Sequence, residues 1–295
     1  MTRSRNFLLM VPLMAAALMP GFGAAAPSTP IPNLTGWWIH PSIPGFEPLA
    51  SGPTSLSNRS RSNGVNNVQQ LVGDYTNPIL KPEAAARVKE LGEQSIAFYG
   101  FHNPRNQCWP NGVPFMLSLS MQMFQQPDKI IIIYQNDHQV RHIRMNAQHP
   151  ARVTPTWYGD SVGHYEGDTL IIDTVGIKVG PFAMVDWYGT PQTEALHVVE
   201  RYRLVDYETA KDGLARDEKE NFRAQPGNMD WNFRGKHLQL LFTVEDPNVF
   251  TTPWSATVTY GKPAVDWIEQ VCAENPNKYG TEEDAKVPTA TKPDF

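Results

Sequence analysis

The stretch at residues 159–174 constrains the fold of this chain more than any other segment. It reads GDSVGHYEGDTLIIDT, in which two β-rich runs flank Glu166, Gly167 and Asp168. A glycine beside an acidic residue accepts the positive φ angle that a tight hairpin turn requires. The stretch therefore predicts two antiparallel strands joined at this turn.

Short β-rich runs bounded by turn residues recur along the rest of the chain. They occupy residues 129–135, 139–145, 195–205, 237–245 and 254–260. Short strands in regular succession are typical of sandwiches and barrels. We therefore predict an all-β domain, an antiparallel meander of about eight to ten strands closed into a lipocalin-like barrel. A two-sheet β-sandwich is the alternative.

Two segments depart from the strand pattern. Residues 81–98 predict one N-terminal helix, because Pro82 and Glu83 suit a first turn and a broken apolar stripe runs on to Ile96. Residues 206–235 form a charged insertion, which we interpret either as a lid over the barrel mouth or as a surface loop.

The two ends of the chain differ in composition from its middle. Residues 1–26 combine a basic start, an apolar core and small closing residues, which predicts a signal peptide. The apolar core is shorter than the ~20 residues of a membrane span, so export is favoured over an anchor. We expect a single domain at residues 27–277, periplasmic or secreted, and a disordered tail at residues 278–295.

The net charge and the sequence motifs limit which ligands, cofactors and metals the protein can bind. A formal net charge of -5 with 19% charged residues argues against nucleic acid, because phosphate binding needs a basic surface. Gly159, Gly163 and Gly167 are spaced for a hairpin and not for a phosphate loop, so no cofactor is expected. His138 and His142 straddle a turn and a strand, and no metal is expected either. We expect an apolar or aromatic small molecule as ligand.

Cys108 and Cys272 are the two cysteines of the chain. In an oxidising compartment such a pair forms a disulfide, which would tie the segment before the strands to the segment after them. A catalytic role for Cys272 is the alternative, but no base lies near it in the sequence.

Ionisable side chains fall inside the apolar strand patterns. Asp173 lies in TLIIDTV and Glu200 in LHVVERYR, each in phase with apolar residues. Strand alternation places Arg141 and His142 on opposite faces, so one charged or titratable group is directed toward whichever face is buried. Such a carboxylate either pairs with a cation or keeps a raised pKa that suits acid–base chemistry. Ser161 is a weak nucleophile candidate, because strand alternation directs its side chain and that of His164 to opposite faces.

Several motifs in one order carry a resemblance. Together with LHVVERYR at 196–203, VEDPNVFTTPW at 244–254 and VCAEN at 271–275, the hairpin resembles a large family of exported bacterial proteins with no settled function. The resemblance covers most of residues 101–275 and implies no reaction. In that family a short turn joins the strands that flank the charged insertion, so the insertion departs from the pattern.

The embedded ionisable groups favour a cofactor-independent enzyme, a lyase, isomerase or hydratase that acts by proton transfer inside the barrel. The alternatives are a non-catalytic carrier for a hydrophobic ligand and a structural envelope protein. The candidate catalytic residues are Asp173 or Glu200 as base, His142 or His197 as proton donor, and Tyr134 and Arg141 as groups that stabilise oxyanion charge.

Overall fold

The computed structural model describes residues 30–41, 43–62, 64–67, 69–98, 100–220 and 228–272. The predicted signal peptide and the predicted C-terminal tail lie outside the described residues. Within the described ranges, no helix combines the length and the apolar character that a membrane span requires.

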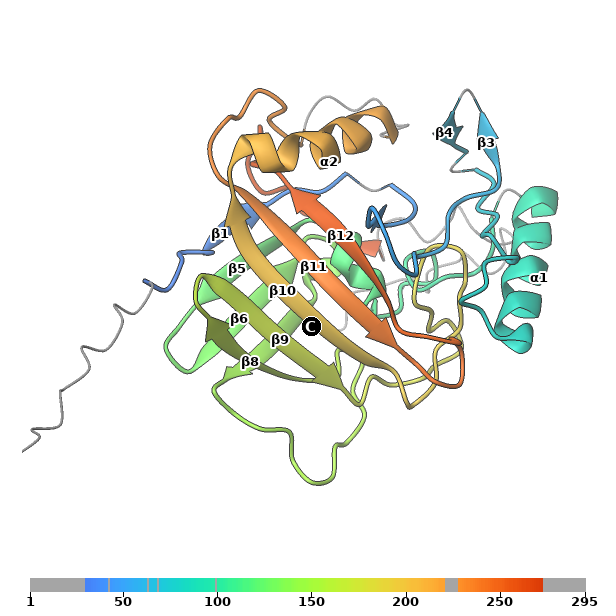
Figure 1. Ribbon diagram of the computed structural model, residues 1–295, viewed down its shortest axis with the longest axis horizontal. Coiled ribbons are helices and arrows are strands. Elements are labelled where there is room, and N and C mark those ends of the chain that lie inside the picture. The colour runs from blue at the N-terminus through green and yellow to red at the C-terminus, as the bar shows by residue number, and fades with distance from the viewer. Residues whose placement is uncertain are drawn as a thin grey trace, which may run out of the picture.

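The molecule is built on one ten-stranded sheet with the order β1-β5-β6-β7-β8-β9-β10-β11-β12-β2 (Figure 1). Its strands are β1 (Gly36–Trp38), β2 (Glu47–Pro48), β5 (Met121–Gln125), β6 (Lys129–Tyr134), β7 (Val140–Met145), β8 (Asp160–Glu166), β9 (Thr169–Val175), β10 (His197–Val205), β11 (His237–Glu245) and β12 (Trp254–Tyr260). A separate two-stranded sheet pairs β3 (Arg61–Ser62) with β4 (Val65–Asn66). The prediction of an all-β fold is confirmed, as one main sheet.

The sheet curls into a half-barrel (Figure 1), and one isolated bridge links the residues just beyond β1 and β12. Ile39 follows β1 and Gly261 follows β12, and their backbones exchange hydrogen bonds of 3.0 and 2.9 Å. The curvature turns one face of every strand toward a common interior, where alternate side chains pack together.

The hairpin of β8 and β9 forms as predicted. Glu166 pairs with Thr169 across the turn, where Gly167 has a φ of 62°. Gly163 allows β7 to approach, because a Cβ there would lie 3.0 Å from side-chain atoms of Ile143 and Met145. The hairpin therefore depends on glycine both at its turn and along its paired edge.

One strand pair does not fit a simple meander. β7 and β8 run parallel, with Ile143 paired to Ser161, while every other pair of the main sheet is antiparallel. The antiparallel prediction is wrong here, because residues 146–159 carry the chain back past β7 before β8 begins. This crossover places a loop beside the outer face of the sheet.

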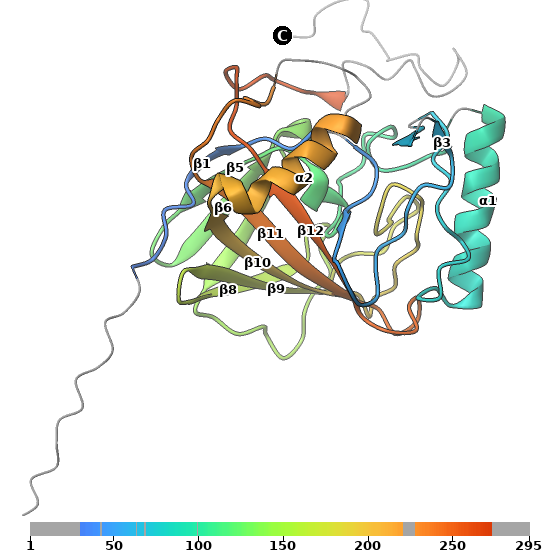
Figure 2. The same cartoon turned by 45° about the horizontal axis from the view of Figure 1, so that its top comes forward.

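The helix α1 (Pro82–Phe98) confirms the predicted helix. It buries Ala84, Val88 and Leu91, whereas Ile96 is 51% exposed and does not belong to the packed stripe. In Figures 1 and 2 the helix lies to one side of the sheet, against the N-terminal loops. α1 therefore packs beside the sheet and not into its interior.

The charged insertion contains a second helix, α2 (Tyr207–Glu220), which the strand-based analysis missed. α2 lies across the ends of β10, β11 and β12 (Figure 2). Ala210 and Leu214 pack in a small apolar cluster with Ile39, Val205 and Met229. The insertion is therefore docked on the sheet through residues 207–220, and residues 221–227 lie outside the described ranges.

Buried polar groups lie under α2. The Nδ1 of His40 donates a hydrogen bond to the Ser118 carbonyl (2.8 Å), and its Nε2 lies 3.4 Å from Oδ2 of Asp217. Burial lowers the pKa of His40 to about 3 and raises the pKa of Asp217 well above its ordinary value. The proton of this pair therefore resides on Asp217.

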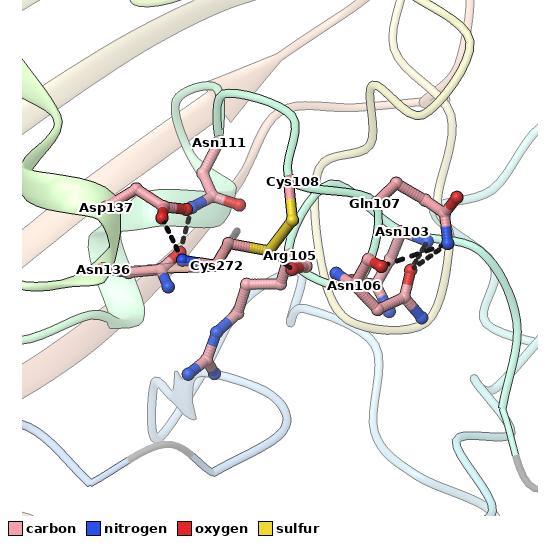
Figure 3. Close-up of a disulfide and its surroundings, with 9 residues drawn as sticks. All are labelled: Asn103, Arg105, Asn106, Gln107, Cys108, Asn111, Asn136, Asp137 and Cys272. Carbon is pink, nitrogen blue, oxygen red and sulfur yellow. Dashed lines mark hydrogen bonds between the residues drawn. A yellow bond between two sulfur atoms is a disulfide. The ribbon is translucent and has the colours of Figure 1, made fainter. Parts of the chain in front are cut away.

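The predicted disulfide between Cys108 and Cys272 is present, with a Cα–Cα distance of 5.4 Å (Figure 3). Next to it, the side chain of Asp137 accepts a hydrogen bond from the Cys272 backbone amide at 2.5 Å. The bridge fixes the end of the described chain onto the loop before β5, and the contact with Asp137 fixes it onto the connection between β6 and β7. A disulfide is compatible with a secreted protein.

Candidate functional site

Arg141 and Glu200 form an ion pair inside the half-barrel. Two hydrogen bonds of 2.6 and 3.0 Å join the guanidinium to the two carboxylate oxygens. Arg141 is 1% exposed and Glu200 is 0% exposed. The charges are therefore paired with each other and shielded from water.

Hydroxyl groups complete this interior network. Ser161 and Thr174 accept hydrogen bonds from the guanidinium at 3.1 and 2.7 Å, and Tyr202 donates to Glu200 at 2.9 Å. Ser161 is 3% exposed and lies between Arg141 and Thr174. It acts as a bridge between strands, which removes it from consideration as a nucleophile.

Electrostatics stabilise the charged form of the pair. Burial alone would lower the pKa of Arg141, but the charge and hydrogen bond of Glu200, together with Tyr134 and Tyr202, outweigh burial and raise that pKa. Burial also raises the pKa of Tyr134 to about 12, and its buried hydroxyl makes no hydrogen bond to any part of the chain that the structure describes. Arg141 therefore stays protonated and Tyr134 stays neutral, so neither side chain transfers protons near neutral pH.

Asp173 and His197 form a second group on the outer face of the same strands. Nε2 of His197 lies 3.0 Å from Oδ1 of Asp173, and the two side chains are 35% and 38% exposed. Nδ1 of His197 lies 3.9 Å from Oε2 of Glu245, too far for a hydrogen bond. This imidazole therefore has one nitrogen hydrogen-bonded to a carboxylate, while its other nitrogen makes no hydrogen bond to Glu245, the second carboxylate beside it.

His149 joins this outer group, and the sequence analysis did not select it as a site residue. From the β7–β8 crossover its Nε2 lies 3.1 Å from Oδ1 of Asp173, and its Nδ1 lies 2.6 Å from Oδ1 of Asp160. Arg144 donates to both oxygens of Asp160, at 2.7 and 2.9 Å. The alternation of residues along the strands could not identify His149 as a site residue, because only the path of the β7–β8 crossover brings it next to β9.

Three carboxylates surround the two outer histidines. Asp160 and Asp173 contact His149, and Asp173 also contacts His197. Glu245 lies on the other side of His197, with Oε2 at 3.9 Å from Nδ1.

The pKa shifts agree with this arrangement. The hydrogen bond from His197 lowers the pKa of Asp173, against the opposing effect of burial. The same hydrogen bond raises the pKa of His197. Asp173 therefore stays ionised, and His197 accepts a proton more readily than an isolated imidazole.

The six candidate residues do not form one site. Arg141, Glu200 and Tyr134 lie inside the half-barrel, and Asp173 and His197 lie outside it. His142 is exposed on the outer face of β7 and joins neither hydrogen-bond network among the described residues. The interior residues therefore do not meet the outer ones, because alternation directs neighbouring strand residues to opposite faces.

Comparisons with known proteins and metal-binding geometry add no further assignment. In the described ranges, no group of three or more His, Cys, Asp and Glu side chains is placed to hold a metal ion. Searches of protein-family models, of curated proteins and of solved structures found no match to this chain.

Proposed function

We propose that the protein is an exported enzyme that transfers protons without a cofactor, with His197 and Asp173 as its acid–base pair. The observation that supports this function is the 3.0 Å contact between Nε2 of His197 and Oδ1 of Asp173 on a partly exposed surface. An imidazole oriented by a carboxylate, with its second nitrogen accessible, is the arrangement that general acid–base catalysis uses.

The proposed step begins with neutral His197. Its Nε2–H donates to Asp173, so Nδ1 carries the free electron pair and takes a proton from a C–H or O–H group of the substrate. The imidazolium is stabilised by Asp173. It then returns the proton to another atom of the substrate in an isomerisation, or to a departing oxygen in an elimination.

The interior network supports this site from behind. Arg141, Ser161, Thr174 and Glu200 come from the four consecutive strands β7, β8, β9 and β10. Thr174 directly follows Asp173 in β9, so the two networks lie on opposite faces of the same strands. Arg141 and Glu200 are positioning residues in this proposal, because they hold the strands and do not meet the substrate.

A labelling experiment tests the proposal without a known substrate. The full-length protein is incubated in D₂O with extracts of the host's growth substrates, and mass spectrometry detects compounds that gain deuterium or gain or lose water. We expect His197→Gln to reduce this conversion by about 10² to 10⁴-fold, the usual contribution of a general base. Asp173→Asn should reduce it as well.

His164→Gln is the matched control, because His164 also contacts a carboxylate, Glu166 at 3.1 Å, on an exposed strand surface. It should leave conversion unchanged. Since a base must be unprotonated, the rate should rise with pH through a pKa above the ordinary value of His. Equal conversion by wild-type protein and His197→Gln would overturn the proposal.

The second candidate is a non-catalytic carrier for a hydrophobic ligand. It is favoured by the enclosure of Arg141, Glu200 and Tyr134, the groups that would bind a charged intermediate in an enzyme of this kind. For a carrier, the D₂O experiment yields no labelled product, while ligand is still retained by the folded protein.

A further inference from the structure

The outer face of β10 carries an arginine whose charge is not paired. Arg201 lies on the same face as His197, two outward-facing positions further along the strand. It is partly buried, and within the described ranges its side chain makes no hydrogen bond, ion pair or ring contact. By contrast, the next arginine on that face, Arg203, donates to Oε1 of Gln239 at 2.9 Å. The guanidinium of Arg201 therefore has donors that no described part of the chain uses.

The strand positions directly beside Arg201 are apolar. β10 lies between β9 and β11 in the sheet (Figure 1), and the register pairs Arg201 with Ile171 on one side and Leu241 on the other. Ile171 is 5% exposed although it faces outward, and it belongs to neither apolar cluster of the described residues. Long side chains cover apolar neighbours in this way with their stems while the charged head stays in water. Arg201 therefore presents its charge above an apolar surface.

The charges differ between the two ends of this face. At the His197 end, Oδ1 of Asp173 lies 3.0 Å from Nε2 of the imidazole, and Oε2 of Glu245 lies 3.9 Å from Nδ1. These carboxylates repel an anion, whereas Arg201 attracts one. An anionic ligand is therefore oriented with its charge at Arg201 and its other end at His197.

Val199 is the outward-facing residue between these two ends. It is partly buried, and its cross-strand neighbours are Asp173 and Thr243. The Cα atoms of residues four apart in a strand are separated by about 13 Å, which is the case for His197 and Arg201. A ligand that contacts both side chains therefore has an apolar segment long enough to pass over Val199.

We propose that the substrates of this surface are apolar carboxylates and that Arg201 selects them. The carboxylate pairs with the guanidinium of Arg201, the apolar body packs on Val199, and the group that loses a proton lies at Nδ1 of His197. The last of these contacts rests on the proposed acid–base function, whereas the binding of a carboxylate by Arg201 does not. Arg201 determines specificity in this arrangement, because it is remote from the reacting atoms.

An NMR titration of the full-length protein with labelled valine methyl groups tests the site, because it detects weak binding. The probe is 3-phenylpropionate, and its amide has nearly the same shape without the charge. The probe should shift the signals of Val199, which the Val199→Ile variant identifies by their absence. The amide should bind about five- to tenfold more weakly, and so should acetate, which lacks the apolar body. Equal affinities for acid and amide, or no shift at Val199 with the probe, would refute the proposal.

Two variants of the same strand locate the charge that binds the probe. Arg201→Met removes the guanidinium and keeps an unbranched apolar side chain, so affinity for the probe should fall about five- to tenfold while the amide is unaffected. Arg203→Met is the matched control, because Arg203 faces the same way and is already bonded to Gln239. It should bind the probe normally. Unchanged affinity in Arg201→Met, or the same loss in both variants, would exclude Arg201 as the anion site.

The two proposals can fail separately. His197→Gln should lose deuterium incorporation and keep its affinity for 3-phenylpropionate. Arg201→Met should slow conversion at low substrate concentration and leave it near normal at saturation, because a lost binding contact raises KM. Equal conversion by wild type and His197→Gln, with probe binding still dependent on Arg201, would overturn the enzyme alone. Normal conversion and normal probe binding by Arg201→Met would overturn the role of Arg201 alone.

Discussion

Single residues in the interior carry large energetic consequences. Arg141 and Glu200 are both buried, and each depends on the other for its charge to be tolerated. Removing one partner of a buried pair leaves an uncompensated charge and costs about 3 to 5 kcal/mol, whereas replacing both with apolar residues is often nearly neutral.

We therefore predict that Arg141→Met alone lowers the free energy of unfolding by about 3 kcal/mol or more. The double variant with Glu200→Leu should recover most of this loss. Arg144→Met, which breaks a largely exposed pair with Asp160, should change stability by less than about 1 kcal/mol. Urea titration measures all three, and a larger loss in the double variant would contradict the prediction.

His40 and Asp217 give stability a defined pH dependence. In the folded protein, His40 and Asp217 together hold one proton at any pH between the lowered pKa of His40 and the raised pKa of Asp217. The unfolded chain holds two protons below about pH 3.9, one between about pH 3.9 and 6.5, and none above. Because stability rises with pH only where the unfolded chain holds more protons, it increases up to about pH 3.9, is level to about pH 6.5, and then falls.

The prediction is that this pair lowers stability as pH rises above the ordinary pKa of His, for as long as Asp217 keeps its proton in the folded protein. Asp217→Asn should remove that alkaline loss, since Asn stays neutral and can still donate toward His40. Denaturant titrations from pH 5 to 9 compare the two proteins. Parallel curves for wild type and variant would contradict it.

At the scale of elements, α2 shows how packing overrides local preference. Gly213 lies within the helix, where alanine is normally better by about 1 kcal/mol. A Cβ at Gly213 would lie 2.5 Å from Oγ1 of Thr259 and 2.8 Å from Oε2 of Glu47. The glycine therefore allows α2 to approach β12 closely.

We predict that Gly213→Ala destabilises the protein despite its higher helix propensity. A close steric overlap of this kind typically costs about 1 to 3 kcal/mol. Lys211→Ala, at an exposed position of the same helix, should have little effect. Thermal unfolding distinguishes the two, and a higher Tm for Gly213→Ala would show that the helix does not dock as described.

Strand alternation predicted the faces of side chains but not their partners. It separated Arg141 from His142 and placed Glu200 in phase with the apolar residues of β10, and both are confirmed. The pairing of Arg141 with Glu200 depends on how β7 and β10 curl toward each other, which local pattern does not contain.

Two other features were not predictable from local pattern for different reasons. α2 was missed because its apolar contacts come from few positions, chiefly Ala210 and Leu214, within a strongly charged segment. The parallel pairing of β7 and β8 has no local signal either, since residues 146–159 read as an ordinary connection. His149 became visible as a site residue only through that crossover.

At the scale of the whole molecule, the disulfide links parts of the chain that lie 164 residues apart in sequence. The chain-entropy description assigns about 4 to 5 kcal/mol to closing a loop of this length. The bridge also holds the last described residues against the loop before β5.

Replacing Cys108 and Cys272 together with serine should therefore lower the free energy of unfolding by up to about 5 kcal/mol. Urea denaturation of the oxidised protein and of the double variant provides the measurement. Identical stability would show that the link contributes nothing to the fold.

The contact between Ile39 and Gly261 has a consequence for how copies of this chain behave when crowded. Exposed margins of a sheet offer unpaired amides and carbonyls that can recruit strands from another molecule and begin fibrils. Here the bridge joins the chain just beyond β1 to the chain just beyond β12, and the outermost strand on that side, β2, spans only Glu47–Pro48 and carries a proline, which cannot donate. The native molecule thus offers a poor template for amyloid growth.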